Sequence, residues 1–544
     1  MPDDNPNLDL PQLEARPPEP EMEPASQPQD QVESPPQPVS PSPPPTAEPV
    51  EAAPSEAFFP PEKTEVKEEA KKEVPLFREE PAGFSGFSLP EQKLLSVKPA
   101  GRSFALGKKM IFLILGGAAV IAASFFVLSL LRKNNQPEAE AVLNYWGLWE
   151  PEPVIQGIIA QFEEDHPGIK IIYTQQDKDD YRARLQASFS RNEGPDLFRF
   201  HNTWTPMLKD ELAPVPESLA GSLALETDYF PIISESIKQR GLYYGVPLMI
   251  DTLALYYNKD ILSRANKSPP RTWWGLENLA KELTVRPDQK ITVAGAALGA
   301  ISNVDHWSDI IGLMIYQNGG DPASPDSLTE DVIKYYLRFK NYDRVWDESL
   351  PRSTAAFAAE KLAFYFGPSW RIFNILEANP NLNFGITNVP QLPKLRDTDW
   401  EAAERGEAEL TDINWATFWV EGVSVKSQHQ EEAWQFLEFL STAETMQKLY
   451  TAQSQIRSFG ELYPRIDLAE DLKGDPLVKP FIDQAGTAKS WYLCSYTRDA
   501  GINDRIISYY ETAINTFEQP TGENKAMEPL INGIKQILSQ YKAD

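Results

Sequence analysis

The sequence has little of what most enzymes and metalloproteins use. It holds one cysteine, Cys494, and only four histidines among 544 residues. One cysteine excludes an intrachain disulfide, and so few sulfur and imidazole ligands exclude a typical transition-metal site, so we predict no metal and no cofactor. A zinc-type His-Glu-x-x-His motif, a phosphate-binding glycine loop with its lysine, and a Gly-x-Ser-x-Gly motif are all absent from the sequence. Paired carboxylates for glycoside hydrolysis have no fixed spacing and stay open, but we expect no enzyme.

Large apolar side chains are scarce in residues 1–107, which contain 23 of the 48 prolines and many glutamates. Such a segment cannot bury enough surface to offset its chain entropy, so it is predicted to be disordered. Its proline clusters between Pro35 and Pro49 favour a polyproline II conformation. They suit either a spacer or the ligand of an aromatic groove.

Charge is missing altogether from Met110–Leu131. About 22 helical residues extend roughly 33 Å, enough to cross a hydrocarbon core of about 30 Å. The flanking charges are asymmetric, with five basic residues before the run and two after it: Lys93, Lys98, Arg102, Lys108 and Lys109, then Arg132 and Lys133. Because basic flanks stay in the cytoplasm, 108–133 is predicted to be an uncleaved single-pass anchor in the cell membrane. Residues 1–107 are then cytoplasmic, and residues 134–544 form an extracellular domain.

Basic residues are outnumbered in 134–544, where 59 acidic residues face 38 basic ones, a net charge near −21. This segment repels polyanions, so nucleic acid is not predicted as a partner. Its length of about 410 residues exceeds one compact core and suits two lobes.

The segment begins with alternating strand and helix patterns. Strands are predicted over 141–146, 169–173 and 196–200, and amphipathic helices over 153–164 and 179–191. This alternation is typical of an α/β fold with a parallel sheet, in which ligands meet the loops after the strands.

Later segments continue the pattern. Residues 241–262 read as an apolar strand pair containing the single acid Asp251. Residues 357–373 read as a helix end, a strand and a Gly-Pro-Ser-Trp turn. A strand is predicted over 415–427, and one amphipathic helix over 431–450.

Five motifs occur in order: FEEDHPGIKI (162–171), GPDLF (194–198), GVPLMIDTLALYYNKDIL (245–262), AAEKLAFYFGPSW (358–370) and EEAWQFLEFLSTAETMQKLY (431–450). Together they resemble the extracellular solute-binding proteins of ABC importers, in particular the carbohydrate-binding group (family 1, maltose-binding-protein-like). The resemblance covers about residues 140–540. It implies a two-lobed periplasmic-binding-protein (type II) fold that closes around its ligand, with chain crossings near 248–252 and 416–422. It places lobe 1 at about 138–249 and 421–475, and lobe 2 at about 250–420 and 476–544.

The resemblance also implies site residues. Asp251 matches the family's acceptor of sugar hydroxyl groups, although a hinge carboxylate capped by backbone amides fits it equally. Trp370 matches a tryptophan that stacks on a sugar ring. The loop that carries polar ligand contacts in the family holds His201, Asn202 and Trp204 here. Thr203 and Trp204 replace its acidic and basic pair, which argues against maltose itself.

Further stacking surfaces are predicted from the remaining tryptophans of loops and helix ends, while Trp415 and Trp419 are assigned to strand packing. The predicted stacking residues are Trp146, Trp149, Trp307 and Trp491.

The sequence therefore predicts a membrane-anchored solute-binding protein that passes a carbohydrate to an ABC transporter permease. Two alternatives stay open. The Tyr-Trp-x-x-Trp-Glu segment at residues 145–150 also resembles polyamine binders, so a polyamine or peptide ligand is possible. A ligand sensor that signals through the cytoplasmic region is the other. Several carboxylates in the site would favour a polyamine.

Overall fold

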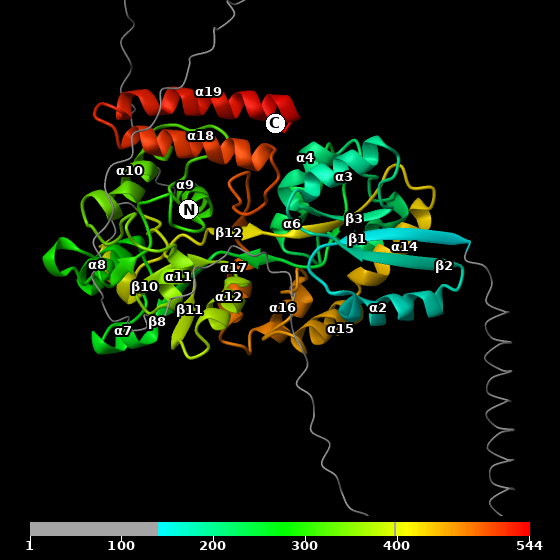
Figure 1. Ribbon diagram of the computed structural model, residues 1–544, viewed down its shortest axis with the longest axis horizontal. Helices are drawn as coiled ribbons and strands as arrows, with labels where there is room; N and C mark the ends of the chain where they lie inside the picture. Colours follow the sequence, from blue (N-terminus) through cyan, green and yellow to red (C-terminus); the bar gives the residue numbers. More distant parts are fainter. Residues whose placement is uncertain (1–139, 396–398, 544) are drawn as a thin grey trace, which may run out of the picture. The chain divides into compact units, whose positions relative to one another are not determined.

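The computed structural model describes residues 140–395 and 399–543 (Figure 1). The predicted disordered region 1–107 and the predicted anchor 108–133 lie outside the described residues. Across the part of the chain that is described, none of the helices combines the length and apolar character needed to span a bilayer.

The first sheet has five strands in the order β2-β1-β3-β13-β6. Strand β1 (Ala141–Gly147) pairs in parallel with both β2 (Ile169–Gln175) and β3 (Leu197–His201). Helices α2 (Glu152–Asp165) and α3 (Tyr181–Ser190) connect these strands, so the predicted α/β alternation is confirmed. The apolar stripe of α2 is buried at every predicted position, which explains why this segment folds as a helix against the sheet: Val154, Ile155, Ile158, Ile159 and Phe162.

Two strands from remote parts of the chain complete this sheet. Strand β13 (Trp419–Val423) runs antiparallel to β3 and places Trp419 opposite His201. Strand β6 (Val246–Pro247) pairs with the other edge of β13. Residues more than 200 positions apart therefore meet at the carboxyl end of β3.

The second sheet has four strands in the order β11-β8-β10-β9. Strand β8 (Ala254–Asn258) lies antiparallel between β10 (Leu362–Gly367) and β11 (Phe384–Thr387), and β9 (Ala294–Ala296) runs parallel to β10. Every residue of β10 is buried, as expected for a strand covered on both faces.

A three-stranded connecting sheet, β14-β12-β7, links the other two. Strand β12 (Asn414–Thr417) pairs antiparallel with β7 (Asp251–Thr252) and parallel with β14 (Ala488–Lys489). The chain reaches β8 directly from β7, and β13 directly from β12. The connecting sheet is therefore the point at which the chain passes between the two larger sheets.

Two predicted elements are each divided in the structure. The strand predicted over 415–427 is β12 and β13, which belong to different sheets on either side of Phe418. The helix predicted over 431–450 is α14 (Gln430–Ser441) and α15 (Ala443–Ser454). Thr442 separates them because its backbone is extended and its hydroxyl accepts the amide of Thr445, which caps a new helix.

The C-terminal helices pack against each other, and α18 also contacts α10 and the short helix η1 (Figure 1). The remaining elements are η1 (Asn202–Trp204), α4 (Thr205–Leu208), η2 (Glu217–Leu219), α5 (Ala220–Leu223), α6 (Pro231–Ile237), β4 (Lys238–Gln239), β5 (Leu242–Tyr243), α7 (Lys259–Arg264), α8 (Trp273–Leu283), η3 (Pro287–Gln289), α9 (Trp307–Gln317), α10 (Ser327–Asn341), α11 (Ser353–Ala358), α12 (Arg371–Ala378), α13 (Trp400–Arg405), α16 (Ile466–Leu472), α17 (Lys479–Ala485), α18 (Ile502–Phe517) and α19 (Glu523–Tyr541).

Gly245, directly before β6, has a φ of +92°, and a Cβ there would lie 2.5 Å from the carbonyl oxygen of Glu421. We expect Gly245→Ala to destabilise the protein by more than about 2 kcal/mol, because it adds a backbone clash to the strain of a positive φ. Gly241→Ala is the matched control: its φ is +84°, but its Cβ would meet no atom within 4 Å. It should cost only about 1 kcal/mol in urea unfolding. Equal effects of the two substitutions would contradict the close packing at Gly245.

Candidate ligand-binding site

A first aromatic group forms where β3 ends, and it consists of Trp149, His201, Trp204 and Trp419. The Trp419 ring meets the rings of Trp149 at 5.4 Å and Trp204 at 5.2 Å, both edge to face. Its centroid lies 5.2 Å from the His201 ring. Three predicted site residues, Trp149, His201 and Trp204, therefore lie together. Each of them contacts the ring of Trp419, which the sequence predicts to be a strand-packing residue. Trp149 and Trp419 are half-buried, whereas Trp204 is buried.

His201 is the last residue of β3 and hydrogen-bonds on both sides of its ring. Its Nδ1 lies 2.7 Å from the Thr203 hydroxyl, and its Nε2 lies 2.7 Å from the hydroxyl of Thr417 on β12. Burial lowers the pKa of His201 to about 3, so the ring is neutral at pH 7. Asn202 donates from Nδ2 to the Ser490 hydroxyl at 2.9 Å. The loop after β3 is thus tied to two segments of the connecting region.

A second aromatic group lies beside the second sheet and consists of Trp370, His306 and Tyr496. Trp370 is half-buried, and its ring centroid lies 5.6 Å from that of His306 and 5.8 Å from that of Tyr496. The Arg371 guanidinium covers the Trp370 ring at 4.3 Å and the Tyr496 ring at 4.6 Å. These contacts fix one face of Trp370.

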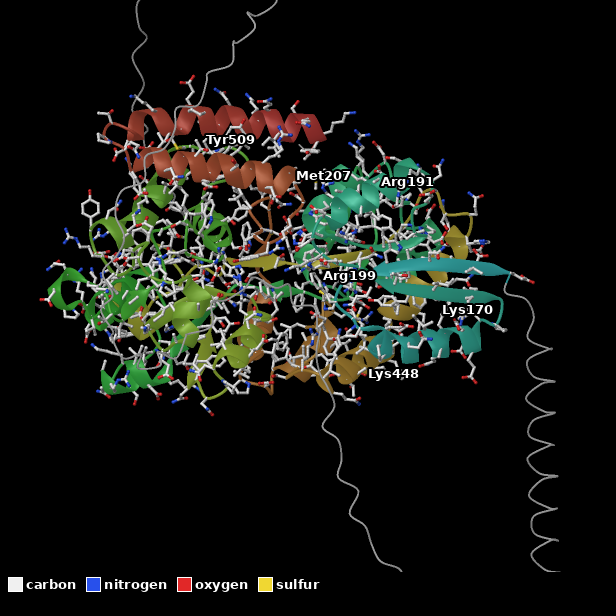
Figure 2. The ribbon with its side chains drawn as sticks, viewed as in Figure 1. Lys170, Arg191, Arg199, Met207, Lys448 and Tyr509 are labelled. Atoms are coloured by element: carbon white, nitrogen blue, oxygen red, sulfur yellow. The ribbon has the colours of Figure 1, made fainter. Side chains whose placement is uncertain are left out.

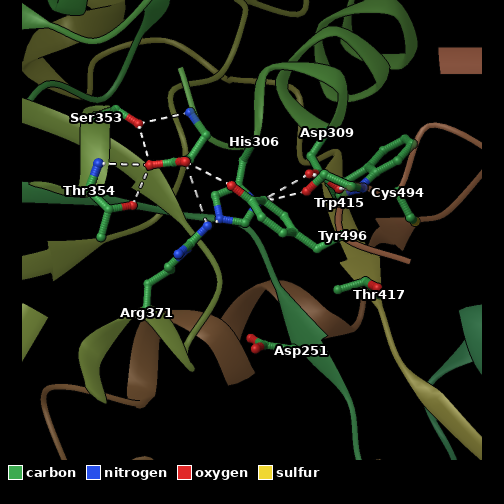
Figure 3. Close-up of polar contacts among 12 residues, drawn as sticks. Asp251, His306, Asp309, Ser353, Thr354, Arg371, Trp415, Thr417, Cys494 and Tyr496 are labelled. Atoms are coloured by element: carbon green, nitrogen blue, oxygen red, sulfur yellow. Dashed lines mark hydrogen bonds and ion pairs between the residues drawn. The ribbon is translucent and has the colours of Figure 1, made fainter. Parts of the chain in front are cut away.

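A buried carboxylate, Asp305, lies at the centre of this second group. Figure 3 shows its partners Thr354, Arg371 and Tyr496 converging from different elements. Asp305 accepts hydrogen bonds from the Tyr496 hydroxyl at 2.7 Å and from Arg352 Nε at 2.8 Å, and Arg371 Nη2 lies 3.8 Å away. Thr354 donates to it from both its amide and its hydroxyl. Burial alone raises the pKa of Asp305, but the Arg371 charge and the Thr354 hydroxyl outweigh it, so the pKa lies well below its ordinary value. This carboxylate is ionised and already fully engaged.

Asp251 joins the second group to the connecting sheet. Its carboxylate accepts the amide of Ser369 at 3.0 Å, the Ser369 hydroxyl at 2.8 Å and the amide of Thr252 at 2.8 Å. Ser369 directly precedes Trp370, and Thr417 lies opposite Asp251 in the pairing of β7 with β12. Burial raises the pKa of Asp251 to about 7, against the lowering effect of the Ser369 donors. The geometry is that of the capped hinge carboxylate, and its role toward a ligand stays a prediction.

Two of the three tryptophans of the first group, Trp149 and Trp419, are next to a buried ion cluster in the chain. Arg199 on β3, labelled in Figure 2, contacts Glu150 at 2.7 Å and Glu421 at 2.5 Å, and each side chain is 1% exposed. Glu150 directly follows Trp149, and Glu421 lies two residues after Trp419. Burial raises the pKa of Glu421, and the Arg199 charge opposes that rise. Removing the cation would leave two carboxylates buried together.

The structure does not bring all predicted residues together. Among the described residues, Trp146, Trp307 and Trp491 have no ring contact with either aromatic group. Trp146 lies at the end of β1 opposite Thr174, and Trp307 begins α9. Trp491 packs against Tyr492 at 5.2 Å. All three are half-buried.

Several residues of the two groups escaped sequence reasoning. Trp419 was assigned to packing because its strand looked continuous with Trp415, and the break at Phe418 carries no sequence signal. His306, Tyr496 and Asp305 come from loops whose proximity to Trp370 depends on long-range packing. Arg371 was the one with a usable signal, since it directly follows the predicted stacking residue.

Two buried donors beside these groups lack a hydrogen-bond partner within the described residues, namely Trp204 Nε1 and Arg371 Nη2. In the same part of the chain, no group of His, Cys, Asp or Glu is arranged to hold a metal ion. The arrangement offers aromatic faces, one indole donor and one guanidinium donor, carried by two α/β units. It defines a two-lobed binding protein of the periplasmic-binding type.

The chain belongs to the bacterial extracellular solute-binding protein family, whose model matches residues 157–478, more than half of the sequence. The family resemblance seen in the sequence is confirmed. Because members of this family bind a solute and do not transform it, the expectation that the chain is not an enzyme is also confirmed.

Individual relatives are distant. The maltotriose-binding protein of Pyrococcus abyssi is 21% identical over 342 residues, covering 60% of this chain and 67% of that protein. An uncharacterised ABC transporter extracellular-binding protein of Pyrococcus horikoshii is 20% identical over 442 residues, covering 75% and 90%. The sugar-binding protein MalE of Xanthomonas citri superposes with a TM-score of 0.57 at 20% identity, covering 74% of this chain and 98% of that one. At this identity the superposition establishes the fold.

Removal of the Arg199 charge should destabilise the protein strongly. We expect Arg199→Met to lower the free energy of unfolding by about 3–5 kcal/mol, because two buried carboxylates lose their cation. Arg191→Met is the control, since Arg191 pairs with Glu193 at the surface with 60% and 66% of the side chains exposed. That pair contributes at most about 1 kcal/mol. Urea unfolding measures both, and similar losses would argue against the buried cluster.

Asp251 should make stability fall with rising pH. Its folded-state pKa of about 7 lies above the ordinary value of 3.8. The folded protein therefore binds more protons than the unfolded chain between these values, and its stability is lost as pH rises through that window. The slope contributed is at most about 1.4 kcal/mol per pH unit. Asp251→Asn should remove it in urea unfolding at several pH values, whereas Asp165→Asn, at an exposed site on α2, should not. An unchanged slope in Asp251→Asn would refute the assignment.

Proposed function

We propose that this protein captures a carbohydrate of the oligosaccharide class between its two lobes and delivers it to the permease of an ABC transporter. The observation that carries the proposal is the pair of aromatic groups. Each is built on a different sheet, and each is hydrogen-bonded to the connecting sheet, through Thr417 for the first and Asp251 for the second. An aromatic face suits the apolar C–H face of a sugar ring, and a few fixed polar groups give orientation.

The charges near the two groups favour a neutral ligand over a polyamine. A polyamine site needs free carboxylates, but each carboxylate here is engaged. Asp305 pairs with Arg352 and Arg371, and Glu150 pairs with Arg199. Asp309 accepts the Trp415 indole N–H and the Ser495 amide. A cationic ligand would also meet the Arg371 guanidinium over Trp370.

The ligands of two relatives also support a saccharide ligand. The Pyrococcus abyssi relative binds maltotriose, and a Streptococcus mutans relative, 22% identical over 315 residues, is a multiple sugar-binding protein. A sensor role remains the second candidate, supported by the length of the segment before the predicted anchor.

Membrane attachment completes the proposal. The uncharged run 110–131 with its basic N-terminal flank supports an anchor that holds 134–544 on the outer surface. Attachment keeps the binding domain near a permease in the same membrane. It raises the effective concentration of the binding domain near the permease without any new contact between them.

Sugar binding is tested by calorimetric titration of the full-length chain with maltotriose, mannotriose, chitotriose and spermidine. We expect one of the saccharides to bind, and Trp370→Ala or Trp419→Ala to weaken it at least about tenfold, equal to about 1.4 kcal/mol. Tyr342→Ala is the control, because that ring is 81% exposed and belongs to neither group. Urea unfolding verifies that each variant folds. Binding of spermidine alone, or full affinity in both folded tryptophan variants, would overturn the proposal.

Topology is tested with single cysteines. Cys494 is the only native cysteine and is buried. Both reporters are therefore placed in a Cys494→Ser background, which has no native thiol. Ser55→Cys and Lys525→Cys then each introduce one reporter. A membrane-impermeant maleimide added to intact cells should label Lys525→Cys and should label Ser55→Cys only after lysis. The reverse pattern would show that the binding domain is not outside.

A further inference from the structure

A cavity of about 360 Å³ lies on the second-sheet side of the molecule, away from both aromatic groups. Helices α8, α9 and α10 line it, together with Leu392 and the start of α13. Its walls include four aromatic rings, those of Trp273, Trp274, Tyr335 and Trp400. The volume falls within the range of about 300–1,000 Å³ found for small-molecule sites.

The aromatic walls are held in place by buried contacts. Trp273 is buried, stacks on Phe366 at 5.5 Å and donates its indole N–H to Gln317 at 2.6 Å. Tyr335 donates its hydroxyl to the carbonyl oxygen of Trp273 at 3.2 Å. These two rings cannot turn away without breaking core packing.

The other two tryptophans keep hydrogen-bonding capacity. Trp274 and Trp400 are half-buried, and within the described residues neither indole N–H donates a hydrogen bond. The exposed carboxylate of Asp331 also has no partner there. The cavity therefore combines aromatic faces with two unpaired donors and one free acceptor.

The charges beside the cavity are largely paired with one another. Glu277, the other carboxylate in the wall, receives Lys281 at 2.8 Å and Arg338 at 3.0 Å. The same two cations also lie 4.0 Å and 3.5 Å from Asp343, so they balance two carboxylates. Within the described residues, Asp331 is the wall carboxylate that has no cation partner. A neutral polyhydroxylated ring gains both stacking on the aromatic walls and hydrogen bonds from the unpaired groups, and spermidine serves as the cationic comparison in the test.

Helix α9 separates this cavity from the aromatic groups of the first site. Its N-terminal turn carries Asp309, which contacts Trp415 and His306. Its C-terminal end carries Met314, Gln317 and Asn318 in the cavity wall. At 1.5 Å per residue, Gln317 lies about 12 Å along the helix axis from Asp309, so the contacts of Asp309 and the cavity wall are at different ends of the helix.

We propose that this cavity is a second saccharide-binding site that accepts one or two neutral sugar units. Trp274 and Trp400 stack on the ring and donate their indole N–H groups to hydroxyls, and Asp331 accepts a hydroxyl. The site is independent of the capture of ligand between the lobes. It would retain a second saccharide, or part of a longer chain, on the outside of the second lobe.

The test is fluorine NMR of the full-length chain labelled with 5-fluorotryptophan, which gives one resonance for each of the 13 tryptophans. Substitution of single tryptophans by phenylalanine assigns the resonances. We expect millimolar maltotriose, mannotriose or chitotriose to shift the Trp274 and Trp400 resonances, both in the native sequence and in Trp370→Ala. The resonance of Trp346, a fully buried ring, is the internal control and should not move.

Two variants make the test specific. Trp274→Ala should abolish the shift at Trp400 and leave any shift at Trp370 intact. Asp331→Asn changes an exposed side chain that has no hydrogen bond or ion pair within the described residues, and it should weaken the saccharide response at Trp400 at least about threefold without changing the urea midpoint. A shift at Trp274 and Trp400 without one at Trp149, Trp370 or Trp419 supports the second site and counts against the interlobe proposal.

Three results would overturn the second site. Saccharides that shift only Trp149, Trp370 and Trp419 leave the proposed function standing and remove this inference. If spermidine shifts the Trp274 and Trp400 resonances and the saccharides do not, the cavity binds a cation and not a saccharide. No shift at Trp274 and Trp400 with any of the three saccharides would show that the cavity stays empty.

Discussion

The antiparallel pairing of β7 with β12 is the interaction on which the rest of the binding arrangement depends. This short pairing brings Asp251 opposite Thr417, and each of these residues reaches a different aromatic group. Thr417 holds His201 of the first group, and Asp251 holds the residue before Trp370. The neighbouring Trp415 of β12 donates to Asp309 and so fixes α9 as well. A local change in this strand pair would therefore displace residues of both aromatic groups.

The polar groups around the site are used mainly to position aromatic rings. Arg199 is enclosed between two carboxylates that follow Trp149 and Trp419 closely in the chain, so its charge stabilises the loops that carry these rings. Asp305 fixes the positions of Tyr496 and Arg371, because it accepts the Tyr496 hydroxyl and pairs with the Arg371 guanidinium. With their charges already satisfied, these residues leave little electrostatic attraction for an ionic ligand. In the proposed site, selectivity would rest on ring stacking and on donors such as the indole N–H of Trp204, which has no partner within the described residues.

The sequence carried enough information for the α/β alternation, because periodic burial and turn residues are local properties. The stripe of α2 and the parallel strands β1, β2 and β3 follow from such patterns. The division of the helix at Thr442 had a sequence signal, since threonine is a good N-cap residue. The spacing of apolar residues continues across Thr442, however, and this continuity favoured one long helix. The break between β12 and β13 could not be predicted, because Phe418 is an apolar residue within an apolar run and only the sheet partners differ on its two sides. For the same reason the sequence predicted Trp149, His201 and Trp204 but missed Trp419, whose place depends on pairing across more than 200 residues.

The separation of the two aromatic groups bears on how a ligand would close the lobes. A ligand shifts such an equilibrium only by its difference in affinity for the two states. Within the described residues, no ring of the first group contacts a ring of the second, so each group is complete without the other. A sugar stacked on one group alone gains nothing from closure. Only a ligand long enough to stack on both, or rigid enough to reach Asp251 from either, gains contacts in the closed state that the open state lacks. For the proposed sugar ligand, closure of the lobes therefore requires contacts with both groups at once.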